Sequence, residues 1–463
     1  MNKEEPVTPV GRLFLQEEGN QVINCITNAK YRINIESVKA EIKNSILIQH
    51  PRFQSVLVKN KNGREYWKRG DVNLDKHIFV IQDIDHGDSP SGILSDDEIV
   101  NEYLADLTVS SPLNIDKPLW EIHILKDQNC IVLRINHALG DGVSLMSLIL
   151  AMCRKVDQPD QLPSIRKNST KSSSSSSSMR EMIWRLVMKI WLTIVYGTGF
   201  LLRSLCLKDA KSKISCGHGV QLWPRKLATA RFKLDDMKSV KNAVLNATIN
   251  DVLFGVIASG LSRYLDYHRT SDSKPKEGLQ ITGIAMVNLR EQPGLQEMSS
   301  LVKSSSVTSW WGNKFAFLLL PIYPHKNVGN DALQYVKNAK EMLDKKKLSL
   351  EAHFTYAISK LAMSLLGPKV TYFLNNKVFC NTSFTTSNVV GPQEEIMFGG
   401  NPITSFRATS SSLPHALTMH MVSYAGKAEM QILVAKDIIP DPQFLAKCFE
   451  DALLEMKEAS VKI

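Results

Sequence analysis

The sequence has few of the features that mark secreted or disulfide-rich proteins. Its seven cysteines among 463 residues are odd in number and scattered, with no close pair and no metal-ligand spacing. Disulfide frameworks use even sets of cysteines, so we expect reduced thiols in a protein that faces the cytosol. The first residues, MNKEEPVTPVGRLF, also lack the apolar core of a secretory signal peptide.

Several common catalytic signatures are missing. The chain has no GxSxG nucleophile elbow, no Walker P-loop and no HExxH zinc motif. The glycine pair Gly217 and Gly219 is not followed by the third glycine of a dinucleotide fingerprint. The sequence therefore gives no support for a serine hydrolase of that type, a P-loop enzyme or a zinc peptidase, and we expect neither a metal nor a cofactor.

Positive charge is concentrated in one part of the chain. The formal net charge is +10, and residues 166–213 contain ten basic and two acidic residues, so this stretch supplies +8 of it. The remainder is close to neutral. This distribution argues against a nucleic-acid-binding protein and for a local anionic partner such as lipid headgroups.

Length and a serine run predict the domain organisation. A chain of 463 residues favours two domains or one large two-lobed unit. The unbroken run Ser172–Ser178 cannot bury apolar surface and is typical of a flexible linker. We therefore expect an N-terminal lobe over residues 1–163, a basic linker over 164–215 and a C-terminal lobe over 216–463.

Apolar spacing predicts helices and strands on both sides of this linker. In the first half it predicts helices over 35–50 and 143–156, and strands over 52–59, 120–125 and 131–136, the last two forming a hairpin. In the second half it predicts a helix from Thr248 to Leu265, strands over 279–287 and 431–435, a tight loop over 387–392 and an amphipathic helix over 441–458. The mixture indicates an α/β (α+β) protein.

Residues 179–207 form an amphipathic segment that we expect to contact a membrane. Its uncharged core, residues 190–202, is shorter than the roughly 20 residues of a spanning helix. Trp184 and Trp191 lie opposite a polar stripe on a helical wheel, which favours a helix in the membrane interface with the stripe at the headgroups. A spanning helix with snorkelling basic residues and a helix packed on the protein core are the alternatives. The stripe consists of Glu181, Arg185, Lys189, Tyr196 and Arg203.

One short stretch, RINHALGDGVS at residues 134–144, carries candidate chemistry. His137 leaves a predicted strand through a turn in which Gly140 and Gly142 permit sharp backbone dihedrals. Its ordinary pKa of about 6.5 allows it to accept a proton at neutral pH. Asp141 precedes a predicted helix and could cap it or pair with a cation. A strand-end histidine with a capping aspartate would give the same pattern, so these residues alone leave both interpretations open.

An ordered set of motifs resembles the plant wax ester synthase/diacylglycerol acyltransferases, within the CoA-dependent acyltransferase superfamily. The resemblance covers nearly the whole chain. The family signature is HHxxxDG, with its second histidine as the proposed base. Here Asn136 takes the first position, where it cannot accept a proton, and His137 takes the second. The motifs are EPVTPVGRLF (5–14), KPLWEIHI (117–124), NHALGDG (136–142), TINDVLFG (248–255), VNLR (287–290), WGN (311–313), TSNVVGPQEEI (386–396), HALTMH (415–420) and IPDP (439–442).

The resemblance implies a two-domain fold of mixed sheets flanked by helices, with a tunnel between the lobes. Acyl-CoA is the implied co-substrate, and a fatty alcohol or diacylglycerol is the implied acceptor. His137 would remove the proton from the acceptor hydroxyl as it attacks the thioester. Asp141 would shape the site by pairing with an arginine, for which Arg290 is the candidate.

Other residues of the motifs have both a functional and a structural interpretation. Asn250, Asp251 and Asn388 match motifs near the implied tunnel, where they could contact substrate or the oxyanion. The structural interpretation of Asn250 and Asp251 is that they stabilise the first turn of the helix that follows Thr248. The structural interpretation of Asn388 is that it is a turn residue before Gly-Pro. The histidines of the HALTMH motif, His415 and His420, are expected only to pack within the second lobe.

The expected activity is wax ester synthesis, triacylglycerol synthesis or both, at the cytosolic side of the endoplasmic reticulum membrane, with the plasma membrane as a second location. An acyltransferase of plant secondary metabolism shares HxxxDG but carries a C-terminal DFGWG, which is missing here. A non-catalytic lipid-binding relative is the third interpretation.

Overall fold

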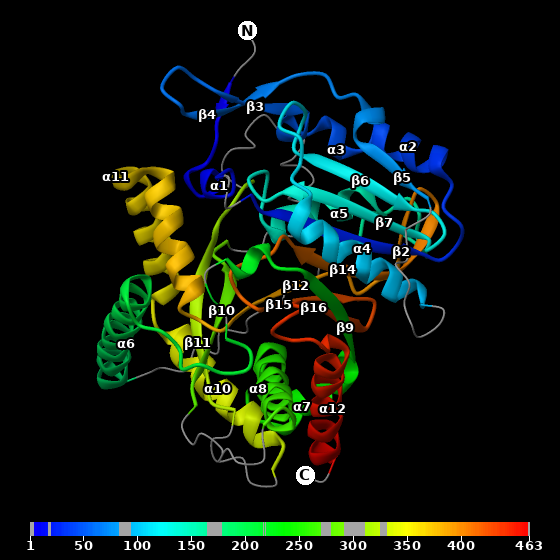
Figure 1. Ribbon diagram of the computed structural model, residues 1–463. Helices are drawn as coiled ribbons and strands as arrows, with labels where there is room; N and C mark the ends of the chain where they lie inside the picture. The colour runs from blue at the N-terminus through cyan, green and yellow to red at the C-terminus, as the bar shows by residue number, and fades with distance from the viewer. Residues whose placement is uncertain are drawn as a thin grey trace.

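Two mixed β-sheets with helices packed against them organise the protein (Figure 1). The structure is a computed structural model that describes residues 4–16, 20–82, 94–163, 178–215, 217, 219–269, 279–290, 311–324 and 331–461. Residues 164–177 of the predicted linker, which include the serine run except for Ser178, lie outside the described residues.

The first lobe is built on a seven-stranded sheet. The helices α2 (Ile35–Asn44), α3 (Ile46–Gln49) and α5 (Gly142–Met152) share one apolar core with it. The predicted hairpin is confirmed, because β6 (Trp120–Leu125) and β7 (Cys130–Asn136) pair antiparallel. Helix α4 (Asp96–Ser110) contributes to a smaller core that joins residues of both sheets. The strand order is β5 (Ile78–Ile81), β6 (Trp120–Leu125), β7 (Cys130–Asn136), β2 (Val22–Ala29), β14 (Asn401–Ser410), β13 (Ile396–Phe398) and β8 (Arg154–Lys155).

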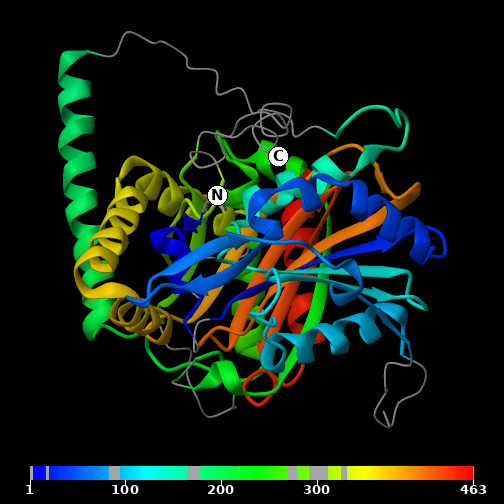
Figure 2. The same ribbon diagram turned by 90° about the horizontal axis from the view of Figure 1, so that it is seen from above.

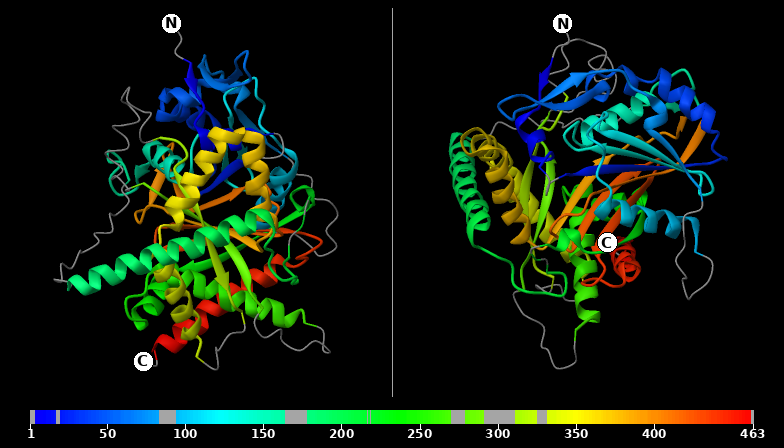
Figure 3. Two further views of the ribbon diagram at one scale, coloured as in Figure 1. Left: turned by 90° about the vertical axis from the view of Figure 1, so that its left-hand side faces the viewer. Right: turned by 45° about the horizontal axis from the view of Figure 1, so that its top comes forward.

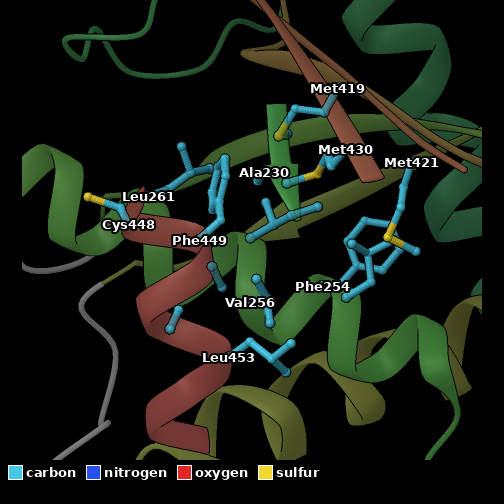
Figure 4. Packing of buried hydrophobic residues seen from close by; sticks show 14 of the residues in the cluster. Ala230, Phe254, Val256, Leu261, Met419, Met421, Met430, Cys448, Phe449 and Leu453 are labelled. Atoms are coloured by element: carbon cyan, nitrogen blue, oxygen red, sulfur yellow. The ribbon is translucent and has the colours of Figure 1, made fainter. Parts of the chain in front are cut away.

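The second lobe is built on a six-stranded sheet whose core is formed with four helices. Figure 4 shows Phe449 and Leu453 of one helix packed against Val256 and Leu261 of another. These two helices approach closely at Gly260, where the Phe449 ring leaves no room for a Cβ atom. The helices are α7 (Leu234–Ala243), α8 (Ile249–Tyr267), α10 (Leu333–Leu348) and α12 (Pro442–Val461). The strand order is β11 (Phe315–Ile322), β10 (Ile281–Asn288), β12 (Phe384–Val390), β15 (Leu417–Tyr424), β16 (Lys427–Ala435) and β9 (Arg225–Lys233).

Several predicted boundaries are wrong. The helix expected over 143–156 ends at Met152, because Arg154–Lys155 form strand β8, which pairs with β13. The strand expected over 431–435 begins earlier, as β16 (Lys427–Ala435). The helix expected over 35–50 breaks at Ser45, which is extended and donates from its hydroxyl to the Ile42 carbonyl. The strand expected from Arg52 begins at β3 (Ser55–Lys59), because Pro51–Gln54 form a 3-10 turn. The loop expected over 387–392 begins only after Val390, because residues 387–390 continue β12 by pairing with β15. Strand β3 belongs to a small sheet with β4 (Glu65–Arg69) and β1 (Glu5–Pro6).

Strands from the second half of the chain complete the sheet of the first lobe. β14 pairs antiparallel with β2, and β13 joins β14 to β8. Residues 396–410 therefore lie in the N-terminal sheet, although the division at the linker placed them in the C-terminal lobe. Strand pairing across most of the length of the chain leaves no local signal in the sequence.

Two long helices cover one side of the molecule. Helix α6 (Met179–Leu205) lies beside α11 (Glu351–Cys380), and its N-terminal end extends away from the body (Figures 2 and 3). Within the described residues, α6 is the one helix long and apolar enough to cross a membrane. Both tryptophans on its apolar side are exposed, Trp184 by 65% and Trp191 by 59%.

The polar stripe of α6 does not lie as expected. Arg203 is buried, pairs with Asp209 at 2.9 Å and donates to the Asn381 carbonyl at 2.8 Å. Tyr196 lies under the Lys346 ammonium, 3.6 Å from its ring centre. The prediction that the whole stripe meets headgroups is therefore wrong for these two residues, which attach the helix to the protein. The apolar side of α6 consequently points outward.

Candidate active site

A cavity of about 240 Å³ lies between the two lobes, lined by side chains from both. The first lobe contributes α1 (Pro9–Leu13), β2 and α5, and the second contributes β10, β11, α11, β12 and β15. Most of the lining is apolar, as in Phe14, Met146 and Phe317. His137 and Asp141 belong to this lining, so the predicted pair faces the space where the resemblance implies a tunnel.

His137 is positioned by the strand that precedes it and by the loop that faces it. It follows directly after β7, and its backbone N–H donates to the Gln21 carbonyl at 2.7 Å. The Phe14 ring stacks on the imidazole with centroids 4.2 Å apart. Trp311 donates from its indole N–H to the Leu139 carbonyl at 2.6 Å, which attaches the loop of residues 311–313 to the histidine turn.

Hydrogen bonds to Asn313 determine which imidazole nitrogen is free. The Asn313 amide nitrogen donates to the His137 carbonyl at 2.9 Å, so its amide oxygen must be the atom 3.0 Å from Nδ1. An amide oxygen can only accept, and Nδ1 therefore carries the proton. No described residue forms a hydrogen bond with Nε2. This nitrogen is unprotonated in the neutral ring and can accept a proton from a substrate.

Burial affects how readily His137 becomes charged. Removal from water lowers its pKa, and this effect outweighs the opposing influence of its own carbonyl, Asp141 and Asn313. The imidazole is therefore neutral at physiological pH, which is the form required of a base.

Asp141 is fully engaged by the protein and does not contact His137 through a hydrogen bond. One carboxylate oxygen accepts from Arg290 at 2.6 Å and from the Lys314 backbone N–H at 2.9 Å. The other oxygen caps α5 by accepting from Ser144 N–H at 3.1 Å. Arg290 also donates to the Gly312 carbonyl. The ion pair is buried and holds the turn and the loop of residues 311–314 together, so Asp141 has no free oxygen for proton transfer.

The two glycines of the motif have a different role from the predicted one. Neither Gly140 nor Gly142 has a positive φ, so the expectation of special dihedrals is wrong. A Cβ at Gly140 would lie 3.2 Å from Ser144 Cβ and 3.4 Å from the Trp311 ring, and one at Gly142 would lie 3.3 Å from Val389. Small size is what the turn requires, because other elements pack closely on it.

Asn136 supports the turn from behind. Its side chain donates to the Asn20 side chain at 2.6 Å and accepts from Ala138 N–H at 2.9 Å. It is buried and does not belong to the cavity lining. Asn136, which stands where the family motif has its first histidine, thus stabilises the turn that carries His137.

The remaining predicted contacts separate into one cavity residue and two outside it. Asp251 forms a capping box with Thr248, which is the structural interpretation, and neither it nor Asn250 lines the cavity. Asn388 does line the cavity, and it donates to the Asn250 side-chain oxygen at 2.8 Å. Asn250 therefore orients Asn388. Within the described ranges, no three His, Cys, Asp or Glu side chains gather in a way that could hold a metal ion.

Comparison with known families accounts for this arrangement. The wax ester synthase/diacylglycerol acyltransferase catalytic domain matches residues 34–253, and the WS/DGAT C-terminal domain matches residues 311–457. Wax ester synthase/diacylglycerol acyltransferase 11 of Arabidopsis thaliana is 34% identical, covering 99% of this chain and 95% of its own. Wax ester synthase/diacylglycerol acyltransferase 4 of the same plant is also 34% identical, and the match covers 99% of this chain and 91% of that protein. The chain belongs to the wax ester synthase/diacylglycerol acyltransferase family.

Solved structures confirm the predicted two-domain fold of this family. The wax ester synthase/diacylglycerol acyltransferase from Marinobacter aquaeolei VT8 superposes with a TM-score of 0.59 at 16% identity, over 98% of this chain and all of the other. A starter condensation domain of rhizomide synthetase RzmA, solved with C8-CoA and Leu-SNAC, gives a TM-score of 0.55 at 11% identity. The match covers 99% of this chain and 94% of that domain. The family predicted from the ordered motifs is thus confirmed.

Two residues of this family member were missed as functional candidates. Asn313 lies in the quoted WGN motif, but nothing in the sequence indicated its contact with His137. His420 was expected only to pack in the core, yet it lines the cavity and its Nδ1 has no hydrogen-bond partner. Burial and the neighbouring His137 lower the pKa of His420 to about 4, so it is neutral at physiological pH. His415, in contrast, does pack as expected, bonded to Thr382 and Thr385.

The lowered pKa of His137 predicts the pH dependence of the reaction. A base works in its neutral form, so activity is lost as pH falls through the pKa of the base. Because burial moves this pKa below 6.5, we expect the fall of kcat/KM with decreasing pH to be centred below pH 6.5. A profile whose acid limb is centred above pH 6.5 would contradict this assignment.

The bond between Asn313 and His137 predicts a smaller, specific defect. In Asn313→Ala the imidazole loses the group that keeps the proton on Nδ1, and we expect kcat to fall by about tenfold, the value of one hydrogen bond. Steady-state assays over a range of acceptor concentrations would separate this from a change in KM. An unchanged kcat in folded Asn313→Ala would remove Asn313 from the account.

Proposed function

We propose that this chain transfers a fatty acyl group from acyl-CoA to the hydroxyl of a long-chain alcohol, of diacylglycerol, or of both. The observation that carries the proposal is a neutral histidine with a free Nε2 in an apolar cavity between the lobes. The names of the relatives support the substrates, and the chain needs no group beyond its own residues and the two substrates for this reaction.

The proposed chemistry is one direct transfer. The acceptor oxygen attacks the thioester carbonyl while Nε2 of His137 takes the hydroxyl proton. The tetrahedral intermediate expels CoA by breaking the carbon–sulfur bond, and the imidazolium returns the proton to the departing thiolate. The products are an ester and free CoA, and His137 is again neutral.

Neighbouring residues position the base and the oxyanion in this proposal. Asp141 and Arg290 hold the histidine turn against the loop that carries Asn313. Asn388 has a second amide hydrogen beyond the one used on Asn250, and it donates this hydrogen to the developing oxyanion. An apolar lining strengthens such a bond, because little water competes for it.

Helix α6 supplies membrane attachment in the same proposal. Its outward apolar side, with Trp184 and Trp191 exposed, enters the interface of the endoplasmic reticulum membrane on the cytosolic side. Because α6 is also long enough to span, extraction with alkaline carbonate distinguishes the two modes. Release into the supernatant supports an interfacial helix, and retention in the pellet supports a span.

The acceptor is identified by a direct assay. Purified protein is incubated with labelled palmitoyl-CoA and either hexadecanol or diacylglycerol, and the products are resolved by thin-layer chromatography. We expect labelled wax ester, triacylglycerol or both. No ester from either acceptor would contradict the proposed function and would favour a non-catalytic lipid-binding protein.

A further inference from the structure

Helix α11 has a kink whose apolar side chains point into solvent. Gly367 has φ of 75° and ψ of 177°, values outside the helical region, and Pro368 follows it. Positive φ suits glycine, so the sequence Gly-Pro produces a defined change of direction there. Leucines next to the kink are unusually exposed, Leu365 by 72% and Leu366 by 52%. Leu361, Val370 and Phe373 extend the same apolar segment, with exposures between 45% and 52%.

The exposed charges of this helix have one sign. Lys360 and Lys369 are exposed on either side of the kink, and Lys377 is partly exposed farther along. The single acidic residue of α11, Glu351, is buried and bonded to Lys346 at 2.7 Å. An apolar segment between lysines complements a bilayer with anionic headgroups, because lysine stems reach past apolar surface toward phosphate.

The opposite side of α11 lines the active-site cavity. Tyr356, Ser359, Tyr372, Asn375 and Phe379 all belong to that lining. The same helix therefore has one side toward His137 and another toward the outside. Helix α11 therefore separates this part of the cavity from the outer side of the molecule.

The apolar segment continues the outward face of α6. Gly197 of α6 approaches the Phe354 ring so closely that a Cβ would lie 3.1 Å from it, and Leu350 N–H donates to Thr193 Oγ1 at 2.9 Å. Figure 3 shows α6 crossing this side of the molecule with the kinked α11 arching beside it. The exposed apolar residues of the two helices therefore lie on neighbouring elements at one side of the molecule, where one flat partner can contact both.

We propose that residues 361–373 of α11, termed the kink segment, form a second membrane-contacting surface beside α6, and that the lipid acceptor enters the cavity past α11. The membrane contact stands on the exposed leucines and lysines alone. The route of the acceptor rests on the proposed function. A bilayer fits better than a protein partner, because the segment combines apolar side chains with lysines and adjoins the apolar face of α6.

Vesicle flotation of the full chain tests the membrane contact without turnover. The double variant Leu365→Glu/Leu366→Glu is expected to bind vesicles of phosphatidylcholine and phosphatidylserine at least about tenfold more weakly, since two leucines no longer enter the apolar layer. The matched control Leu245→Glu/Leu454→Glu changes two exposed leucines remote from α11 and is expected to float like the unmodified protein. Equal flotation of all three would overturn the proposal.

A second double variant tests the role of the lysine charges. Its binding to uncharged vesicles shows whether any loss comes from a folding defect instead. Lys360→Glu/Lys369→Glu is expected to weaken binding about tenfold to vesicles that contain phosphatidylserine and to leave binding to pure phosphatidylcholine unchanged. Equal loss on both vesicle types would overturn the charge argument. If the kink segment instead contacts a second copy, gel filtration will show a dimer that Leu365→Glu/Leu366→Glu separates while flotation stays unchanged.

An assay of ester formation tests the proposed route of the acceptor separately from the proposed function. With whichever of hexadecanol or diacylglycerol the protein esterifies embedded in vesicles, Leu365→Glu/Leu366→Glu is expected to form ester at least about fivefold more slowly than the control variant, following its loss of binding. Unchanged ester formation with weakened flotation would overturn the route. No ester from the unmodified protein with either hexadecanol or diacylglycerol would contradict the proposed function and leave the flotation result standing.

Discussion

Replacement of His137 by alanine is expected to lower the rate of acyl transfer by about 10²- to 10⁴-fold, the usual contribution of a general base. Nε2 of this residue is the one free imidazole nitrogen in the turn, and Nδ1 is held by Asn313. His420 also lines the cavity and is neutral, because burial and the neighbouring His137 lower its pKa to about 4, so this variant tests which of the two imidazoles acts as the base. Residual activity comes from holding the two substrates together.

The control for this variant is His353→Ala. His353 is exposed on α11 and does not line the cavity, so we expect the rate of ester formation to stay within about twofold of the unmodified protein. Circular dichroism and thermal melting establish that His137→Ala is folded. More than a tenth of the original rate in folded His137→Ala would remove His137 as the base.

Breaking the buried ion pair is expected to cost stability as well as activity. In Arg290→Met the Asp141 carboxylate remains buried without its cation, and we expect the free energy of unfolding to fall by about 3–5 kcal/mol. Activity should also fall, because the loop that carries Asn313 is no longer held against the histidine turn. Urea denaturation and the ester assay measure the two effects.

Two further variants test the cause of this loss. Arg269→Met breaks an exposed Arg–Asp pair with Asp266 and is expected to cost less than about 1 kcal/mol. Adding Asp141→Asn to Arg290→Met removes the unpaired charge and is expected to recover part of the lost stability. A cost for Arg290→Met no larger than that for Arg269→Met would show that the pair does not hold the site together.

Local patterns predicted the elements that carry the site. The strand-like runs of β6 and β7, the largely buried helix α5 as far as Met152 and the Thr248 cap of α8 all depend on residues close in sequence, and all are confirmed. The contact of Arg290 with Asp141 was expected from the family resemblance alone, since the two residues lie far apart in the chain.

What the sequence did not predict depends on long-range contacts. The Asn313–His137 bond forms only because the loop of residues 311–313 lies against the histidine turn. The position of His420 in the cavity follows from the pairing of β15 with β12 and β16, and the burial of Arg203 depends on Asp209 and Asn381. None of these contacts has a periodicity or a spacing that a linear pattern could reveal.

The most direct test of the account measures both products of one reaction. Native protein is given labelled palmitoyl-CoA, first alone and then with whichever acceptor it esterifies, and free CoA and ester are quantified together. Direct transfer through His137 predicts almost no CoA release without acceptor, and with acceptor one CoA for each ester formed. A burst of CoA in the absence of acceptor, with the acyl group bound to the protein, would contradict it.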